Sequence, residues 1–169
     1  MFLNDYICAA RRASTLLILA CGLATSVVMA AQTVPLPLVS DLEAAAKTAR
    51  EQRVPLLVAF TLKRCPHCNT ARRDYWTPMN SSEKWRGKII MLELELDGAP
   101  ALRDFEGKST TAREFARRFG VRGVPTVIVF DAQGTPAASP LVGLAAADFY
   151  ALYLERAIEA GVAQMGAPP

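Results

Sequence analysis

Two segments decide the fold: Pro55-Leu56-Leu57-Val58-Ala59-Phe60-Thr61 and, after three intervening residues, Cys65-Pro66-His67-Cys68. A short, continuous apolar run is typical of a strand buried on both faces of a parallel sheet. Pro66 suits the first turn of a helix, where its missing N–H is no loss. Helical periodicity continues to Trp76, and Thr77-Pro78 is predicted to end the helix. The sequence therefore predicts a strand, a turn and a helix, with Cys65 at the helix N-terminus.

Helices and strands also alternate on either side of this unit. Ser40 and Glu43 have the spacing of a capping box, which predicts a helix over residues 41–53. Gly120 is predicted to end a later helix, and Pro140 suits an edge strand. The other expected elements are strands over 89–96, 126–131 and 137–142, helices over 110–119 and 145–160, a loop over 97–109, and a frayed tail over 161–169.

The composition is that of a small globular protein. The chain has 169 residues, of which 51% are hydrophobic and 21% are charged. One domain and a short additional segment fit this length, and the apolar content excludes a disordered or collagen-like chain. The net charge of +3 is too small to indicate a nucleic-acid partner, so none is expected.

Residues 1–30 have the order of a secretory signal peptide. Arg11 and Arg12 precede an apolar stretch, and small residues follow up to Ala30, after which we expect cleavage. One alternative is an uncleaved membrane anchor, because residues 13–31 are nearly long enough to span a bilayer. Another is a lipoprotein signal at Cys21. The sequence thus predicts an exported domain over residues 31–169, located in the periplasm.

Two cysteines remain once this leader is removed. Cys8 and Cys21 belong to the leader, which leaves Cys65 and Cys68. A disulfide that closes so short a loop stabilises a fold very little, because stabilisation grows with loop length. The pair is therefore expected to serve redox chemistry or metal binding.

The position of Cys65 favours redox chemistry. The thiolate is the attacking species, and a helix N-terminus lowers the pKa of a cysteine. His67, Lys63 and Arg64 are expected to stabilise the thiolate further, which makes the disulfide more oxidising. His67 has an alternative interpretation as a solvated turn residue. Cys68, one turn into the helix, is expected to be the resolving thiol.

The order of elements, the cysteine pair and a later Val124-Pro125-Thr126 together resemble the thioredoxin superfamily. Pro66-His67 matches the dipeptide between the cysteines of DsbA-type oxidants, whereas the length is similar to that of thioredoxin-sized SoxW and SoxS proteins. The resemblance implies an α/β fold with a central mixed β-sheet flanked by helices. It also implies a cis Pro125 packed against the disulfide, with Val124 and Thr126 contacting the client chain. The alternative for Pro125 is an ordinary trans proline at a strand start.

The sequence departs from the family pattern at two places. Ala59 stands where thioredoxins carry a buried acid, and Arg64 replaces an aromatic residue before the first cysteine. Glu93, on the next strand, is a candidate to replace the acid as a proton relay. The alternative is that Glu93 and Glu95 face solvent on a strand exposed on one side.

The leading interpretation is a thiol–disulfide oxidoreductase without metal or organic cofactor. Its expected partners are client proteins with thiols or disulfides and a membrane electron donor or acceptor, and it is expected to be a monomer. The direction, reductant or oxidant and isomerase, stays open. One alternative is a Cu(I)-binding protein using the two cysteines with Met79 or His67, and another is a non-catalytic interaction module. Trp76, Trp85 and Arg72-Arg73 are assigned by default to packing and a solvated helix face.

Overall fold

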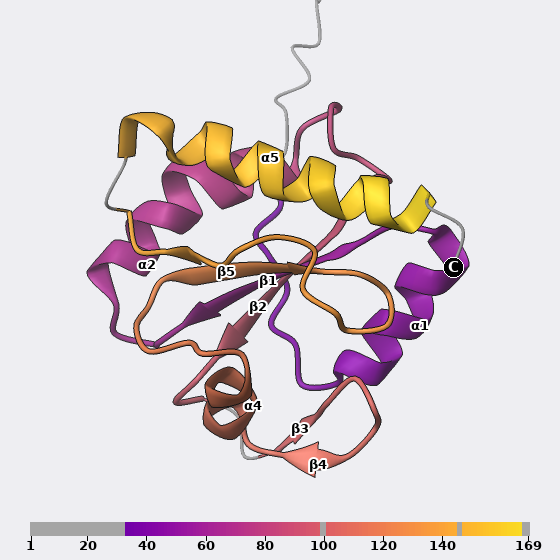
Figure 1. Cartoon of the computed structure of the whole chain (residues 1–169). Helices are drawn as coiled ribbons and strands as arrows, with labels where there is room; N and C mark the ends of the chain where they lie inside the picture. Colours follow the sequence, from indigo (N-terminus) through magenta and orange to yellow (C-terminus); the bar gives the residue numbers. More distant parts are fainter. Residues whose placement is uncertain (1–32, 99–100, 145–146, 167–169) are drawn as a thin grey trace, which may run out of the picture. The chain divides into compact units, whose positions relative to one another are not determined.

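A four-stranded mixed sheet forms the centre of the fold (Figure 1). The computed structural model describes residues 33–98, 101–144 and 147–166. The strand order is β2-β1-β5-β6, in which β1 pairs parallel with β2 and antiparallel with β5, and β5 pairs antiparallel with β6. The predicted α/β fold with a mixed sheet flanked by helices is confirmed. The strands are β1 (Leu56–Thr61), β2 (Ile90–Glu95), β5 (Thr126–Phe130) and β6 (Leu141–Val142).

Helices cover both faces of this sheet, and Figure 1 shows α5 crossing one face and α4 on the other. Alternate residues of β1 enter separate cores: Leu57 and Ala59 pack with residues of the α2-to-α3 segment and α5, whereas Val58 and Phe60 pack with residues of α1 and α4. Every residue of β1 is therefore buried, as its continuous apolar run predicts. The helices are α1 (Leu42–Gln52), α2 (Pro66–Ala71), the π-helical segment η1 (Arg72–Trp76), α3 (Thr77–Asn80), α4 (Ala112–Arg118) and α5 (Ala147–Gly166).

The predicted capping box at the start of α1 is wrong. The N-cap residue is Asp41, whose carboxylate accepts the Ala44 N–H at 2.8 Å. Glu43 instead forms an ion pair with Arg103. An Asp directly before the first helical residue satisfies a free N–H group of the first turn, which leaves Glu43 available to a partner distant in sequence.

The helix that begins after Cys65 does not end at Thr77-Pro78, as we predicted. Between α2 and α3 the chain widens into η1, where the Thr77 N–H bonds to the Arg72 carbonyl five residues earlier. Pro78 then lies at the start of α3, a position that tolerates a missing N–H. The π turn thus allows the helical segment to continue through Pro78 into α3.

Trp76 and Trp85 have the packing role assigned to them. Trp76 is fully buried and Trp85 nearly so. The Trp76 Nε1–H donates to the Tyr150 hydroxyl at 3.0 Å and so connects η1 to α5. Burial, opposed by this hydrogen bond, raises the pKa of Tyr150 to about 12.

Three other predicted boundaries need correction. We expect the last helix to end near residue 160, but α5 continues to Gly166. Gly161 lies inside the helix and close to the sheet, since a Cβ there would lie 2.7 Å from Val129 Cγ1. The predicted loop over 97–109 includes a small hairpin of β3 (Leu102–Arg103) and β4 (Ser109–Thr110). The edge strand expected over 137–142 is shorter in the structure, where β6 comprises Leu141–Val142.

Within the described ranges, no helix is both long and apolar enough to cross a membrane. The predicted signal peptide over residues 1–30 lies outside the described residues. Its cleavage and the alternative membrane anchor therefore stay predictions.

Candidate active site

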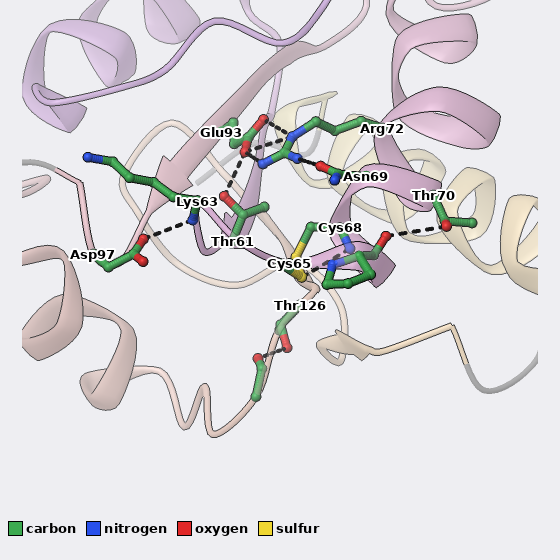
Figure 2. The surroundings of a disulfide bond; sticks show 12 residues. Thr61, Lys63, Cys65, Cys68, Asn69, Thr70, Arg72, Glu93, Asp97 and Thr126 are labelled. Atoms are coloured by element: carbon green, nitrogen blue, oxygen red, sulfur yellow. Dashed lines mark hydrogen bonds and ion pairs between the residues drawn. A yellow bond between two sulfur atoms is a disulfide. The ribbon is translucent and has the colours of Figure 1, made fainter.

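Cys65 and Cys68 form a disulfide at the start of α2 (Figure 2). The S–S distance is 2.02 Å and the Cα atoms lie 5.2 Å apart. Cys65 is the N-cap residue, and its sulfur accepts the Cys68 N–H at 3.0 Å. Cys65 is 6% exposed, whereas Cys68 is fully buried. Of the two sulfur-bearing residues, Cys65 is thus the one that another molecule can reach.

The two residues between the cysteines are exposed. Pro66 occupies the first turn of α2, as predicted. His67 follows it and also faces solvent.

Val124, Pro125 and Thr126 lie at the same end of the sheet as the disulfide. Thr126 pairs with Phe60 near the end of β1, where the chain turns toward Cys65. The Val124–Pro125 peptide bond is cis, and the Pro125 carbonyl accepts the Gly143 N–H at 2.7 Å. Pro125 and Thr126 are buried, and Val124 is half-buried.

Glu93 is buried in the sheet directly beside Ala59. The two residues are register partners in β2 and β1, and Glu93 is 4% exposed. One of its carboxylate oxygens accepts the Thr61 hydroxyl at 2.6 Å. The alternative in which Glu93 faces solvent is therefore wrong, and a carboxylate does lie one strand away from the position where thioredoxins carry it.

Arg72 holds this carboxylate, a role that the sequence analysis missed. Its Nε donates to both oxygens of Glu93, at 3.0 and 2.9 Å, and its Nη2 completes the ion pair. The hydrogen bond to Glu93, opposed by burial, raises the pKa of the Arg72 guanidinium. Arg72 follows Cys68 by four residues, so helical spacing could have placed it on the buried side. The default assignment of Arg72 to a solvated face is wrong, whereas Arg73 is exposed and pairs with Asp74.

Comparison with known proteins identifies the family. Residues 42–158 match the model of a thioredoxin-like domain family. The chain belongs to this family. No curated protein sequence matches the chain.

Solved thioredoxin structures have the same fold as this thioredoxin-like domain. The thioredoxin of Malassezia sympodialis superposes with a TM-score of 0.53 at 15% identity, covering 78% of this chain and 96% of the other. For poplar thioredoxin h the TM-score is 0.52 at 14% identity, with 73% and 96% covered. For the short form of thioredoxin F from spinach chloroplast it is 0.51 at 15% identity, with 76% and 96% covered. Identities this low show the fold alone.

The two basic residues before Cys65 are both exposed. The Lys63 ammonium lies 3.8 Å from the Glu95 carboxylate, and the Lys63 N–H donates to Asp97. Lys63 therefore has an acidic partner on β2. Arg64 is exposed beside Cys65 in this thioredoxin-like domain.

Metal ligands are sparse in the part of the chain that the structure describes. No group of three or more His, Cys, Asp or Glu side chains there is placed to hold a metal ion. Met79, proposed as a copper ligand, is 8% exposed and packs in the core formed with Trp76 and Trp85. The copper alternative is left with Cys65, Cys68 and His67.

Proposed function

We propose that this thioredoxin-like protein is a periplasmic thiol–disulfide oxidoreductase that exchanges disulfides with client proteins. The observation that carries the proposal is the Cys65–Cys68 disulfide at the start of α2, where Cys65 Sγ accepts an N–H and Cys68 is buried. The same N–H group can stabilise the thiolate of Cys65 once the disulfide opens. The cysteine pair is itself the redox group, so no metal or organic cofactor is required.

Client oxidation proceeds in two exchanges. A client thiolate attacks Cys65 Sγ, the Cys65–Cys68 bond breaks, and its electron pair leaves on Cys68 as a thiolate. A second client thiolate then attacks the client sulfur of the mixed disulfide. The client leaves with a disulfide, and the protein keeps both electrons as two thiols.

Client reduction is the reverse. The Cys65 thiolate attacks a client disulfide and releases one client thiolate. Cys68 then attacks Cys65 Sγ, which releases the second client thiolate and restores the Cys65–Cys68 disulfide. In either direction a membrane electron donor or acceptor would return the pair to its starting state.

The residues around the disulfide have supporting roles in this proposal. Pro66 starts α2 and so places Cys65 at its cap. His67 stabilises the thiolate of Cys65 as a donor close to it in sequence. Val124, Pro125 and Thr126 present the chain that contacts the client, since they lie at the same end of the sheet as Cys65.

Two single substitutions test the mechanism. Cys65→Ser should abolish exchange, whereas Cys68→Ser should accumulate mixed disulfides with clients, because the resolving thiol is absent. Mass spectrometry of the trapped species would identify the clients. Exchange that survives in Cys65→Ser would overturn the mechanism, and an unreactive Cys65 thiol would favour the non-catalytic module.

The reduction potential of the Cys65–Cys68 pair decides the direction. A value near −120 mV, about that of DsbA, would indicate a disulfide donor, whereas one near −270 mV, about that of thioredoxin, would indicate a reductant. Equilibration of the purified protein with glutathione buffers measures it. Copper retained by the protein, without a measurable couple, would favour the metal-binding alternative.

Glu93 is proposed to serve as the proton relay for Cys68. Its burial beside Ala59 supports this role, although its hydrogen bonds in the oxidised protein go to Thr61 and Arg72. Glu93→Gln keeps the shape and removes the exchangeable charge. A changed pH profile of exchange is expected, and an unchanged profile would show that Glu93 serves only as the partner of Arg72.

Export and association state are tested on cells and on purified protein. The proposal expects the processed protein in the periplasmic fraction, with cleavage after Ala30, and a monomer by sedimentation. Retention in the membrane fraction would support the uncleaved anchor instead.

A further inference from the structure

We propose that an arginine-lined cavity beside Val124 selects client segments that carry acidic side chains close to the reacting cysteine. This inference rests on the proposed function, since it names the clients of the same active site. The occupant is an extended client chain with a carboxylate near its cysteine.

The cavity lies next to the residues that would handle the client. It has a volume of about 400 Å³, and its lining includes Leu62 and Val124. Leu62 directly follows β1 and comes three residues before Cys65, and Val124 directly precedes Pro125. A chain bound to Cys65 and passing Val124 would therefore meet this cavity.

Three arginines contribute to the lining. Arg113 and Arg117 come from α4 and Arg122 from the segment that follows it, and all three are exposed. In the described part of the chain, neither Arg113 nor Arg122 takes part in an ion pair. No acidic residue is among the lining residues. The positive charge of the cavity is thus not neutralised by its own walls.

The acidic groups close to the cavity in sequence are occupied elsewhere. Glu114, on α4, closes a capping box with Thr111. Asp97, which follows the lining residue Leu96, accepts the Lys63 N–H at 3.0 Å. Glu114 also attracts Arg117, so Arg113 and Arg122 are the lining arginines that are available to an outside partner.

The lining fits a carboxylate on an extended chain better than an isolated ion. Arginine binds carboxylates through paired N–H groups, and the apolar Leu62, Val121 and Val124 can take the aliphatic part of a neighbouring side chain. An unneutralised basic cleft also attracts acidic partners over a distance, which raises their association rate.

The test uses Cys68→Ser protein and synthetic peptides of one sequence, each with one cysteine activated as a 2-thiopyridyl disulfide. The peptides carry glutamate, glutamine or lysine at the same positions flanking that cysteine. The Cys65 thiolate attacks the peptide sulfur, the peptide disulfide breaks, and pyridine-2-thiolate leaves. It takes up a proton from water to give 2-thiopyridone, which is followed by absorbance. The glutamate peptide should react about tenfold faster than the lysine peptide at low ionic strength, and salt at about 1 M should remove most of this difference.

Two charge-matched pairs of substitutions locate the effect. Arg113→Glu with Arg122→Glu should reverse the order of the peptides, and a Glu in the first turn of α4 is favourable for the helix. Lys47→Glu with Arg156→Glu makes the same change in net charge at exposed positions outside the cavity lining, and should keep the original order. Should the charge-reversed protein fail to fold, Arg113→Gln with Arg122→Gln should reduce the preference to near unity.

The outcomes separate this inference from the proposed function. If Cys65 reacts with none of the peptides, the proposed function fails. If it reacts equally with all of them, or if both pairs of substitutions change the order alike, the acidic-client inference is overturned. Oxidised glutathione serves as a further test substrate, because it is a small disulfide that carries carboxylates. If it reacts faster than every peptide, and loses this advantage in the Arg113 and Arg122 variant, the cavity binds a small carboxylate and not a client chain.

Discussion

Arg72 and Arg113 are both basic residues of helices near the active-site end of the sheet, but their surroundings are opposite. Arg72 is 27% exposed and, from η1, holds the buried carboxylate of Glu93 on β2. Arg113 is exposed and faces a cavity without acidic lining. An arginine next to a buried acid on a neighbouring element thus stabilises the fold. An arginine without such an acid nearby is available to bind another molecule.

Between the two arginines, the larger loss of stability is expected when Arg72 is replaced, as in Arg72→Leu. The substitution leaves Glu93 buried without its ionic partner, and breaking a buried pair in this way typically costs about 3–5 kcal/mol. Because Arg72 is a quarter exposed, we expect a loss of about 3 kcal/mol in the free energy of unfolding. Urea unfolding of the oxidised protein would measure it.

The control for Arg72→Leu is the double substitution Arg72→Leu with Glu93→Leu. Replacing both partners with apolar residues is often nearly neutral, so most of the lost stability should return. A double variant as unstable as Arg72→Leu would show that packing of the arginine stem, and not the unpaired charge, causes the loss.

An intermediate effect is expected for Arg118→Gln, at the end of α4. Arg118 bonds at 2.8 Å to Asp104, whose side chain is 3% exposed. Burial would raise the pKa of Asp104, but the hydrogen bonds from Arg118 and from the Lys108 and Glu106 N–H groups hold it below 3.8. Because Arg118 is half exposed, the substitution should cost about 1 kcal/mol at neutral pH.

The stability difference caused by Arg118→Gln is expected to depend on pH. An aspartate with a lowered pKa in the folded state contributes stability above its ordinary pKa of 3.8, and this contribution is lost as the pH falls through the folded value. The difference between the original protein and Arg118→Gln should therefore be complete near neutral pH and shrink below about pH 3.8. A difference that stays constant down to acid pH would exclude Asp104 as its origin.

The smallest effect on stability is expected for Arg113→Gln with Arg122→Gln. Both side chains are exposed, and surface substitutions usually stay within about 0.5 kcal/mol. Urea unfolding should show no larger change, although the reaction with acidic peptides slows. A loss of stability near that of Arg72→Leu would show that Arg113 and Arg122 stabilise the fold, and the contrast with Arg72 would then be wrong.

Local patterns predicted most of the elements around the disulfide. The run from Leu56 to Thr61 is apolar on both sides, and β1 is buried on both faces. Pro66 predicted the start of α2, and the helix does begin there. Such patterns depend on neighbours along the chain, which is why they could be interpreted without the fold. Two helix boundaries were wrong. At Pro78 the chain forms the wider turn of η1, and at Gly161 the helix continues in close contact with β5.

The sequence by itself determined that Cys65 begins a helix and that Cys68 lies one turn behind it, because both are properties of adjacent residues and their spacing. The resemblance to thioredoxins added that Ala59 stands where those proteins carry a buried acid. Only the tertiary structure decided that Glu93 is buried beside Ala59 and held by Arg72, because strand pairing and helix packing bring these residues together from separate elements. It also decided that Arg113 and Arg122 line one cavity with Val124, because the fold brings α4 and the segment that follows it to the place where β5 begins.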